Sequence, residues 1–242
     1  MMYTGLYPLV PHAVRRAGTV RAALGEWGMA IALSAARPIG FLPLPGAHAH
    51  GPRPIIALHG YAMNRANFLP LAFRLARAGL GPVVGFEYWT LGRTAAAARQ
   101  LAWFVDRVRT QTGAAEVDLI GHSMGGVVAH YYVALLGGDG VVKNLITIGS
   151  PHGGTDVSAA GLGYAMRELG GGSQLVKRLA AAPAPAHTHL TTIVSHADAL
   201  VPAARQPPLA GAERIELADL GHVAMLGSRR VARAIIERLG AP

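Results

Sequence analysis

The sequence predicts an α/β fold: a mostly parallel sheet of about six core strands with helices on both faces and a small cap. Short apolar segments alternate with amphipathic helical segments from Pro54 onward. Several of the apolar segments are continuous, which is typical of strands that helices bury on both sides. With 242 residues, 51% of them hydrophobic, the chain can bury one sizeable core.

Six short segments that contain apolar residues and alternate with helical segments are predicted to be strands. They cover residues 54–58, 82–86, 116–120, 143–148, 190–195 and 213–217. The segments between them carry apolar residues three or four positions apart, and two of these helices end at Gly79 and Gly113. A last helix carries Val231, Ile235 and Leu239 on one side. Because crossovers between parallel strands are right-handed, this alternation indicates a doubly wound sheet.

The first fifty residues precede this pattern, and we expect an N-terminal helical extension over residues 1–50. Its apolar run at 27–36 is shorter than the roughly 18 residues of a membrane-spanning helix. Three arginines precede that run: Arg15, Arg16 and Arg21. The composition suits a helix that packs on the domain or lies on a membrane surface. A cleaved leader is the alternative, since Ala-His-Ala at 47–49 could serve as a cleavage site.

Residues 51–242 are predicted to form one α/β domain with a cap insertion at about 155–189. The insertion is long, contains three consecutive glycines at 170–172 and ends near Pro183 and Pro185. An excursion of this length between consecutive strands is more often a functional insertion than a plain connection.

Residues 121–126 read Gly-His-Ser-Met-Gly-Gly and place Ser123 between a predicted strand and a helix-compatible run. A Gly-x-Ser-x-Gly match arises by chance in about a tenth of chains this rich in glycine, so the context carries the prediction. In a strand–turn–helix the serine occupies a sharp elbow, and its hydroxyl is exposed above the sheet. The sequence therefore predicts Ser123 as a nucleophile.

A serine hydroxyl needs a base, usually an imidazole held by a carboxylate, and the chain order in this architecture is Ser, then Asp or Glu, then His. His222 follows the last predicted strand and is the predicted base. Asp198 follows the strand at 190–195 and is the predicted acid, because the carboxyl ends of strands form the active edge of such sheets. Asp219 and Asp156 are the alternative acids. Three histidines compete for the role of base: His187, His189 and His196.

An oxyanion that develops on the attacked carbonyl needs two backbone donors. The Met124 N–H, directly after the nucleophile, is the first candidate. The second is the Tyr61 N–H in the turn after the first strand, where Gly60 permits the required backbone geometry. We expect His59 to be a structural residue of that turn.

The net charge of +9 comes from 22 Lys and Arg against 13 Asp and Glu. The basic residues are scattered along the chain without a nucleic-acid-binding motif, so we expect a solvated basic surface and no nucleic-acid partner. The chain has no cysteine, which excludes disulfides and thiolate metal sites. We predict no metal and no cofactor.

Five features, in the same order, resemble the bacterial triacylglycerol lipase and esterase family of the α/β-hydrolase superfamily. They are His59-Gly60-Tyr61, the Gly-His-Ser-Met-Gly-Gly stretch, Ser150-Pro151-His152-Gly153-Gly154-Thr155, Asp198 and Gly221-His222. The resemblance covers residues 54–239 and implies an α/β-hydrolase fold. It also implies Ser123, Asp198 and His222 as the triad, with Tyr61 and Met124 as oxyanion donors. The chain lacks the disulfide of the larger secreted lipases and shows no calcium-ligand set around Asp156, so no calcium is carried over.

The predicted function is hydrolysis of carboxylic esters through an acyl-enzyme, with lipid-like acyl groups as substrates and possible contact with a lipid interface. Apolar residues of the insertion favour a greasy acyl group, although they could equally form the cap's own small core. They are Leu162, Tyr164, Met166, Leu169, Leu175, Val176 and Leu179. Amide hydrolysis, acyl transfer and a non-catalytic ligand-binding role are the alternatives. A bacterial cytoplasmic or peripheral membrane location is favoured, with secretion as the alternative.

Overall fold

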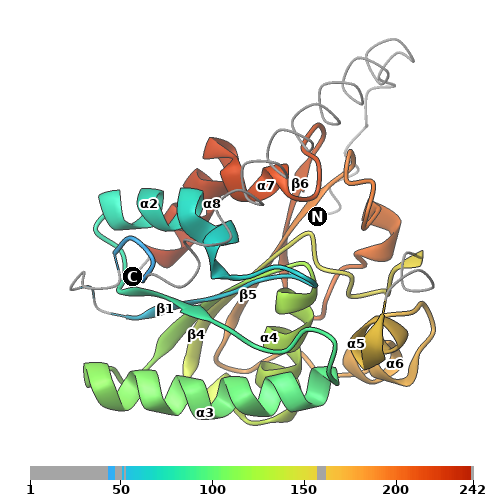
Figure 1. Cartoon of the computed structure of the whole chain (residues 1–242), viewed down its shortest axis with the longest axis horizontal. Coiled ribbons are helices and arrows are strands. Elements are labelled where there is room, and N and C mark those ends of the chain that lie inside the picture. Colours follow the sequence, from blue (N-terminus) through green and yellow to red (C-terminus); the bar gives the residue numbers. More distant parts are fainter. Residues whose placement is uncertain (1–42, 47–50, 52, 157–161, 241–242) are drawn as a thin grey trace, which may run out of the picture.

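The computed structural model describes residues 43–46, 51, 53–156 and 162–240. Its centre is a six-stranded parallel sheet with the order β2-β1-β3-β4-β5-β6 (Figure 1). The strands are β1 (Ile55–Leu58), β2 (Val83–Phe86), β3 (Val117–His122), β4 (Val142–Ile148), β5 (His189–Ser195) and β6 (Glu213–Leu217). Each overlaps a predicted strand, so the predicted sheet is confirmed. β3 runs two residues farther than predicted, because its pairing with β4 continues to His122 and Ile148.

Helices cover both faces of the sheet, as predicted. One layer holds α3 (Thr94–Thr112) and α4 (Met124–Leu135), and the other holds α2 (Leu69–Arg77), α7 (Ala224–Gly227) and α8 (Arg229–Leu239) (Figure 1). Short 3₁₀ helices occupy Arg65–Phe68 (η2), Gly138–Gly140 (η3) and Ala203–Arg205 (η5). The predicted stop at Gly113 is confirmed: this glycine ends α3 with a left-handed φ of 70°.

The two layers explain why β1 is apolar throughout. Ile56 and Leu58 belong to the core beneath α3 and α4, whereas Ile55 and Ala57 belong to the core beneath α2 and α8. Successive side chains of a strand point to opposite faces, so every residue of a strand between two helix layers is buried.

The predicted cap segment contains two short helices, α5 (Gly163–Glu168) and α6 (Gln174–Ala180), between β4 and β5. The Tyr164 N–H donates to the Leu91 carbonyl at 2.9 Å. The Glu168 carboxylate accepts the Thr94 N–H at 2.7 Å, which caps the start of α3. These bonds tie the insertion to the loop that leads into α3.

The predicted N-terminal extension lies mostly outside the described residues. Of its residues, Leu44 is buried in the core beneath α2 and α8, and the Gly46 carbonyl accepts the Val83 N–H at 3.1 Å. Residues 43–46 therefore pack on the α/β domain. Among the described residues, no helix combines the length and apolar character needed to cross a membrane.

Candidate active site

Ser123 occupies a sharp turn between β3 and α4. Its φ of 54° and ψ of −125° form a conformation that residues other than glycine rarely adopt, and such strain persists only where neighbouring structure holds it. The Ser123 N–H donates to the Ile148 carbonyl at 2.9 Å, which fixes the turn to the end of β4. The side chain is only partly buried.

The glycines around Ser123 are required by close packing. A Cβ at Gly121 would lie 2.4 Å from the Gly126 Cα, and one at Gly125 would lie 2.3 Å from the Leu58 carbonyl oxygen. A Cβ at Gly126 would lie 2.0 Å from the Ser150 Oγ. These distances are below any van der Waals contact. The motif therefore lets α4 begin directly against β1 and β4.

Asp198 and His222 form a buried pair at the carboxyl ends of β5 and β6. The His222 Nδ1 lies 2.7 Å from the Asp198 Oδ2. The other oxygen, Oδ1, accepts the N–H groups of Leu200 and Val201 at 3.0 and 2.8 Å. Since a carboxylate oxygen only accepts, Nδ1 carries the proton and the lone pair belongs to Nε2.

The competing acids lie elsewhere. Asp219 forms a 2.5 Å ion pair with Arg230, and Asp156 is paired with Arg205. Asp198 is thus the predicted acid that the structure brings to His222.

The competing histidines are also separate from this pair. His196 pairs with Glu216 at 3.0 Å, and His187 and His189 are exposed. His189 begins β5, at the opposite end of the strand from Asp198.

The turn after β1 approaches Ser123 closely. A Cβ at Gly60 would lie 3.0 Å from the Ser123 Cβ. The turn is closed by a hydrogen bond from the Met63 N–H to the Gly60 carbonyl at 3.2 Å. The Tyr61 N–H is not the donor of this bond. Met124 is the first residue of α4, where a backbone N–H has no acceptor within the helix. The two predicted oxyanion donors therefore belong to segments next to the serine.

His59 is a buried member of the same turn. Its ring stacks on Tyr88 with centroids 4.7 Å apart, and its Nδ1 lies 3.0 Å from the Gly60 carbonyl oxygen. The Nε2 lies 3.3 Å from the Glu87 Oε2, an ion-pair distance without hydrogen-bond alignment. Burial raises the pKa of Glu87, but the His59 and Arg65 contacts outweigh it, so the pKa is lowered overall.

Sequence reasoning missed the role of His122, the residue before the nucleophile. Its Nε2 donates to the His222 carbonyl at 3.0 Å, and its ring lies 4.7 Å from the His222 ring. The side chain is fully buried, and desolvation together with the nearby His222 holds the pKa of His122 well below its usual range. His122 is therefore a neutral residue that fixes the loop of the base.

Gly149 is a second residue that the sequence reasoning did not single out. Its φ is 57°, and a Cβ there would lie 3.2 Å from both the Asp198 Oδ2 and the His222 Nδ1. A side chain at this position would meet the Met225 methyl group at 2.7 Å and would also press on the acid–base pair. The only signal in the sequence is its place directly after a strand.

The Ser150–Thr155 stretch continues from Gly149 and is mostly buried. The His152 Nε2 lies 3.1 Å from the Thr147 Oγ1, and the His152 ring meets His130 of α4 edge-on at 5.3 Å. The Thr155 hydroxyl donates to the Leu200 carbonyl at 3.1 Å. This stretch therefore links the end of β4 to the loop that carries Asp198.

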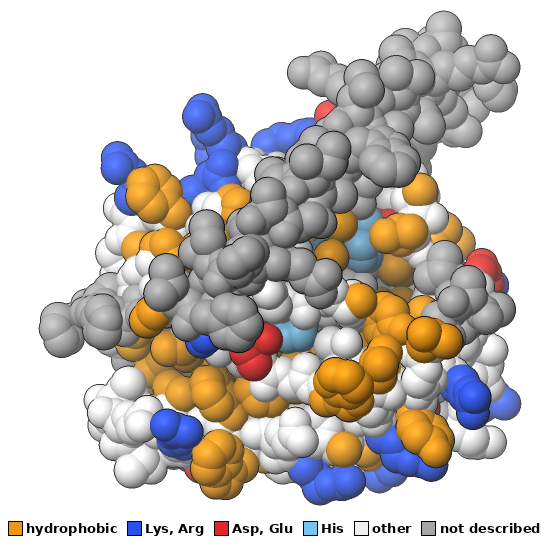
Figure 2. All heavy atoms as spheres, in the orientation of Figure 1, with side chains coloured by type: hydrophobic (Ala, Val, Ile, Leu, Met, Phe, Trp, Pro, Cys, Tyr) orange, Lys and Arg blue, Asp and Glu red, His pale blue; other side chains and the backbone are white. Residues whose placement is uncertain are grey.

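Three exposed hydrophobic residues lie on segments that contact the site. Leu200 lies in the loop of Asp198, whose carboxylate accepts its N–H. Leu162 forms two hydrogen bonds with the Tyr61 hydroxyl, at 2.9 and 3.0 Å. Trp89 precedes Thr90, whose hydroxyl accepts the Ala62 N–H. Leu162 and Trp89 are 73% and 71% exposed. Figure 2 shows exposed histidine atoms, in pale blue, with hydrophobic side chains next to them on this face of the molecule.

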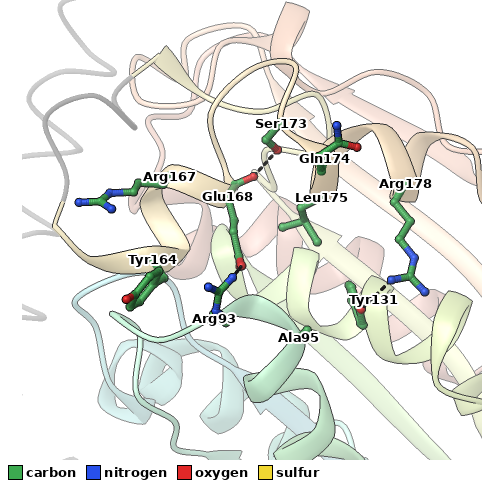
Figure 3. A pocket seen from close by; sticks show the side chains of 10 residues that line it. All are labelled: Arg93, Ala95, Tyr131, Tyr164, Arg167, Glu168, Ser173, Gln174, Leu175 and Arg178. Carbon is green, nitrogen blue, oxygen red and sulfur yellow. Dashed lines mark hydrogen bonds and ion pairs between the residues drawn. The ribbon is translucent and has the colours of Figure 1, made fainter.

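A hollow of about 460 Å³ lies between α5 and α6, the start of α3 and Tyr131 in the second half of α4. Figure 3 shows Glu168 extending toward Arg93 on one side and Arg178 toward Tyr131 on the other. Neither Ser123 nor His222 lines this hollow, so it is separate from the elbow. Within the described ranges, no group of three or more His, Asp or Glu side chains could hold a metal ion.

The sequence was compared with protein families and with known proteins. A sequence model described as alpha/beta hydrolase fold matches residues 53–184, more than half of the chain. Triacylglycerol lipases of Pseudarthrobacter phenanthrenivorans and Burkholderia plantarii are each 42% identical to it over 57 residues. These matches span 24% of this chain and only 17% and 15% of the two lipases.

Solved structures share the fold at low identity. The mature form of a Bacillus licheniformis lipase has a TM-score of 0.70 and 15% identity, covering 77% of this chain and 91% of that one. A Paleococcus ferrophilus monoacylglycerol lipase has a TM-score of 0.60 and 15% identity, covering 77% and 95%. At these identities the likeness concerns the fold alone.

Proposed function

The chain belongs to the α/β-hydrolase fold family, and from this premise we propose that it hydrolyses carboxylic esters with Ser123 as nucleophile. The observation that carries the proposal is the buried Asp198–His222 pair beside a strained serine elbow. A serine hydroxyl becomes a useful nucleophile when such a pair removes its proton.

In the proposed reaction, the His222 Nε2 takes the Ser123 proton while the hydroxyl oxygen attacks the ester carbonyl. The Nδ1–H bond to Asp198 fixes the required tautomer and stabilises the imidazolium that forms. The N–H groups of Tyr61 and Met124 stabilise the oxyanion. His222 then protonates the departing alcohol, and water attacks the acyl-enzyme by the same route to release the acid.

Lipid-like acyl groups are the proposed substrates. The exposed side chains of Trp89, Leu162 and Leu200 offer apolar surface to a hydrocarbon chain, and their segments contact the turn of Tyr61 and the loop of Asp198. The names of the triacylglycerol lipases that match part of the chain support the same substrate class.

We also propose that the N-terminal segment contacts a lipid interface. Residues 14–36 combine basic residues with an aliphatic run and Trp27. This mix suits a helix with its apolar side in the acyl boundary.

A fluorophosphonate probe and a panel of p-nitrophenyl esters from acetate to palmitate test the proposal. Wild-type protein should label and turn over esters, and Ser123→Ala should do neither. Ser150→Ala is the matched control, because Ser150 is a buried neighbour of the motif outside the elbow and should leave labelling intact. A wild-type protein that neither labels nor hydrolyses any ester would favour a non-catalytic ligand-binding role.

A further inference from the structure

The outer sides of α2 and α8 carry four arginines that form no ion pair with any acid among the described residues. They are Arg74, Arg77, Arg229 and Arg233, and we call the surface between them the α2/α8 groove. The two helices pack against each other on one face of the sheet. Other arginines of the chain, such as Arg205, Arg230 and Arg238, are neutralised by neighbouring carboxylates. One carboxylate, Glu237, also lines the groove and lies 3.8 Å from the Arg238 guanidinium, so the four arginines leave the groove with a net positive charge.

The groove is hollow and has an apolar floor. Two adjoining hollows of about 600 and 390 Å³ share Arg74, Arg77 and Arg229 in their walls. Apolar residues line them between the arginines: Pro45, Leu69, Pro70, Phe73, Ala232 and Ile236. Figure 2 shows basic side chains gathered over α2 and α8, with hydrophobic surface between them.

Phe73 adds an aromatic group at the edge of the groove. Its side chain is 54% exposed, and the Arg77 guanidinium lies 5.7 Å from its ring centroid. An exposed aromatic ring beside basic residues is the composition of surfaces that lie at membrane interfaces, where the ring enters the acyl boundary.

The groove reaches the edge of the sheet where the candidate active site lies. Both α2 and α8 run back from the carboxyl ends of the strands, so Leu69, Pro70 and Arg229 lie toward the same edge as Ser123. Pro45, which lines the groove, also belongs to the stretch through which the N-terminal segment joins the domain. One end of the groove therefore lies toward the edge of the sheet that carries the candidate site.

We propose that the α2/α8 groove binds the phosphate headgroups of anionic lipids and thereby docks the domain on a membrane surface. Guanidinium groups match phosphate oxygens with paired hydrogen bonds, and the apolar floor and Phe73 accept the start of the acyl chains. The proposal rests on the proposed function for its purpose, since docking would bring the site to lipid esters. Its physical basis, charge and shape, is independent of catalysis.

Vesicle sedimentation of the full chain tests the docking surface, with phosphatidylcholine vesicles compared with vesicles containing phosphatidylglycerol. The test variant is Arg77→Glu/Arg229→Glu/Arg233→Glu. The control is Arg99→Glu/Arg107→Glu/Arg167→Glu, which makes the same change in net charge at exposed arginines outside the groove. Each basic residue near an anionic surface contributes roughly fivefold in binding, so loss of three arginine charges costs on the order of 100-fold and the charge-reversed groove variant should lose at least that much. The control should lose far less.

Three further measurements make the result decisive. Thermal unfolding checks that the variants are folded. If the charge-reversed groove variant is unfolded, the neutral variant Arg77→Gln/Arg229→Gln/Arg233→Gln takes its place. Phe73→Ser should weaken binding with the arginines intact. Turnover of soluble p-nitrophenyl butyrate should not change, so absence of turnover in wild-type protein would refute the proposed function and leave the binding result readable. Equal losses in groove and control variants, wild-type binding by the groove variant, or groove-dependent binding to duplex DNA in preference to vesicles would overturn the proposal.

Discussion

Replacing Asp198 by Asn should inactivate the proposed enzyme by reversing the tautomer of His222. The backbone N–H groups of Leu200 and Val201 both donate to the Asp198 Oδ1. In the variant, the amide oxygen should keep these two bonds, and the NH₂ group must then replace Oδ2 opposite the His222 Nδ1. An amide N–H donates to Nδ1, so the proton moves to Nε2 and the base has no lone pair for Ser123.

The magnitude follows from the cost of turning the amide around. The flipped amide would restore an acceptor for Nδ1 but would leave the buried Val201 N–H and the partly buried Leu200 N–H facing an NH₂ group, at a cost of about 1–3 kcal/mol each. A total of at least about 2 kcal/mol leaves about 3% of the molecules productive. The expected loss in kcat is therefore at least about 30-fold, rising to about 10⁴-fold where the flipped state is not populated.

Steady-state hydrolysis of a soluble p-nitrophenyl ester measures this loss, with thermal unfolding as the check on folding. Asp219→Asn is the matched control, because Asp219 pairs with Arg230 on the surface and should lose less than twofold. Equal activity of the two variants, or a larger loss in Asp219→Asn, would refute the reasoning.

Further predictions concern two residues that contact this pair, the buried His130 and the N-terminal segment. Gly149→Ala should lower kcat at least tenfold with little change in KM, because the new Cβ presses on the acid–base pair; unchanged kcat would mean that the loop yields. His122→Phe keeps a ring in place but removes the donor to the His222 carbonyl, so kcat should fall about tenfold, whereas a change confined to KM would contradict a positioning role. Burial lowers the pKa of His130 from 6.5 to about 4, so between these values only the unfolded chain binds the proton and stability falls as pH falls, by up to about 3 kcal/mol. Denaturant unfolding of wild type and His130→Gln at pH 4 to 7 checks this, since the variant should show a weaker pH dependence. Deleting residues 1–42, which keeps the buried Leu44, should leave turnover of soluble esters intact and weaken sedimentation with anionic vesicles; equal sedimentation would exclude the segment as an anchor.

The features that the sequence predicted well are those with a local signature. β1 is a short apolar run because two helix layers bury both of its faces, and that pattern is visible without knowledge of its neighbours. Ser123 is marked by the glycines that the elbow requires. Asp198 and His222 each lie in the loop that follows a strand, β5 ending at Ser195 and β6 at Leu217, which selects positions at one edge of the sheet.

Other features depend on contacts between distant segments and left no local mark. Gly149 matters because the ends of β4, β5 and β6 converge there, and the role of His122 requires the carbonyl of a residue 100 positions away. The order of the strands, with β3 and β4 central, brings these segments together, and no spacing along the chain expresses it.

The distribution of charge on the surface also depends on contacts between segments that are distant in the sequence. Along the sequence the arginines look scattered, which favoured a solvated basic surface. In the fold, α2 and α8 come from opposite ends of the domain and pack together, so Arg77 and Arg229 line one hollow although about 150 positions separate them. Among the described residues, carboxylates pair with arginines elsewhere, as in Arg205–Asp156 and Arg238–Glu213, and none forms an ion pair with the four groove arginines, although Glu237 lines the groove. Packing thus gathers four of the chain's basic residues, Arg74, Arg77, Arg229 and Arg233, on one surface, and such a local positive field attracts an anionic surface.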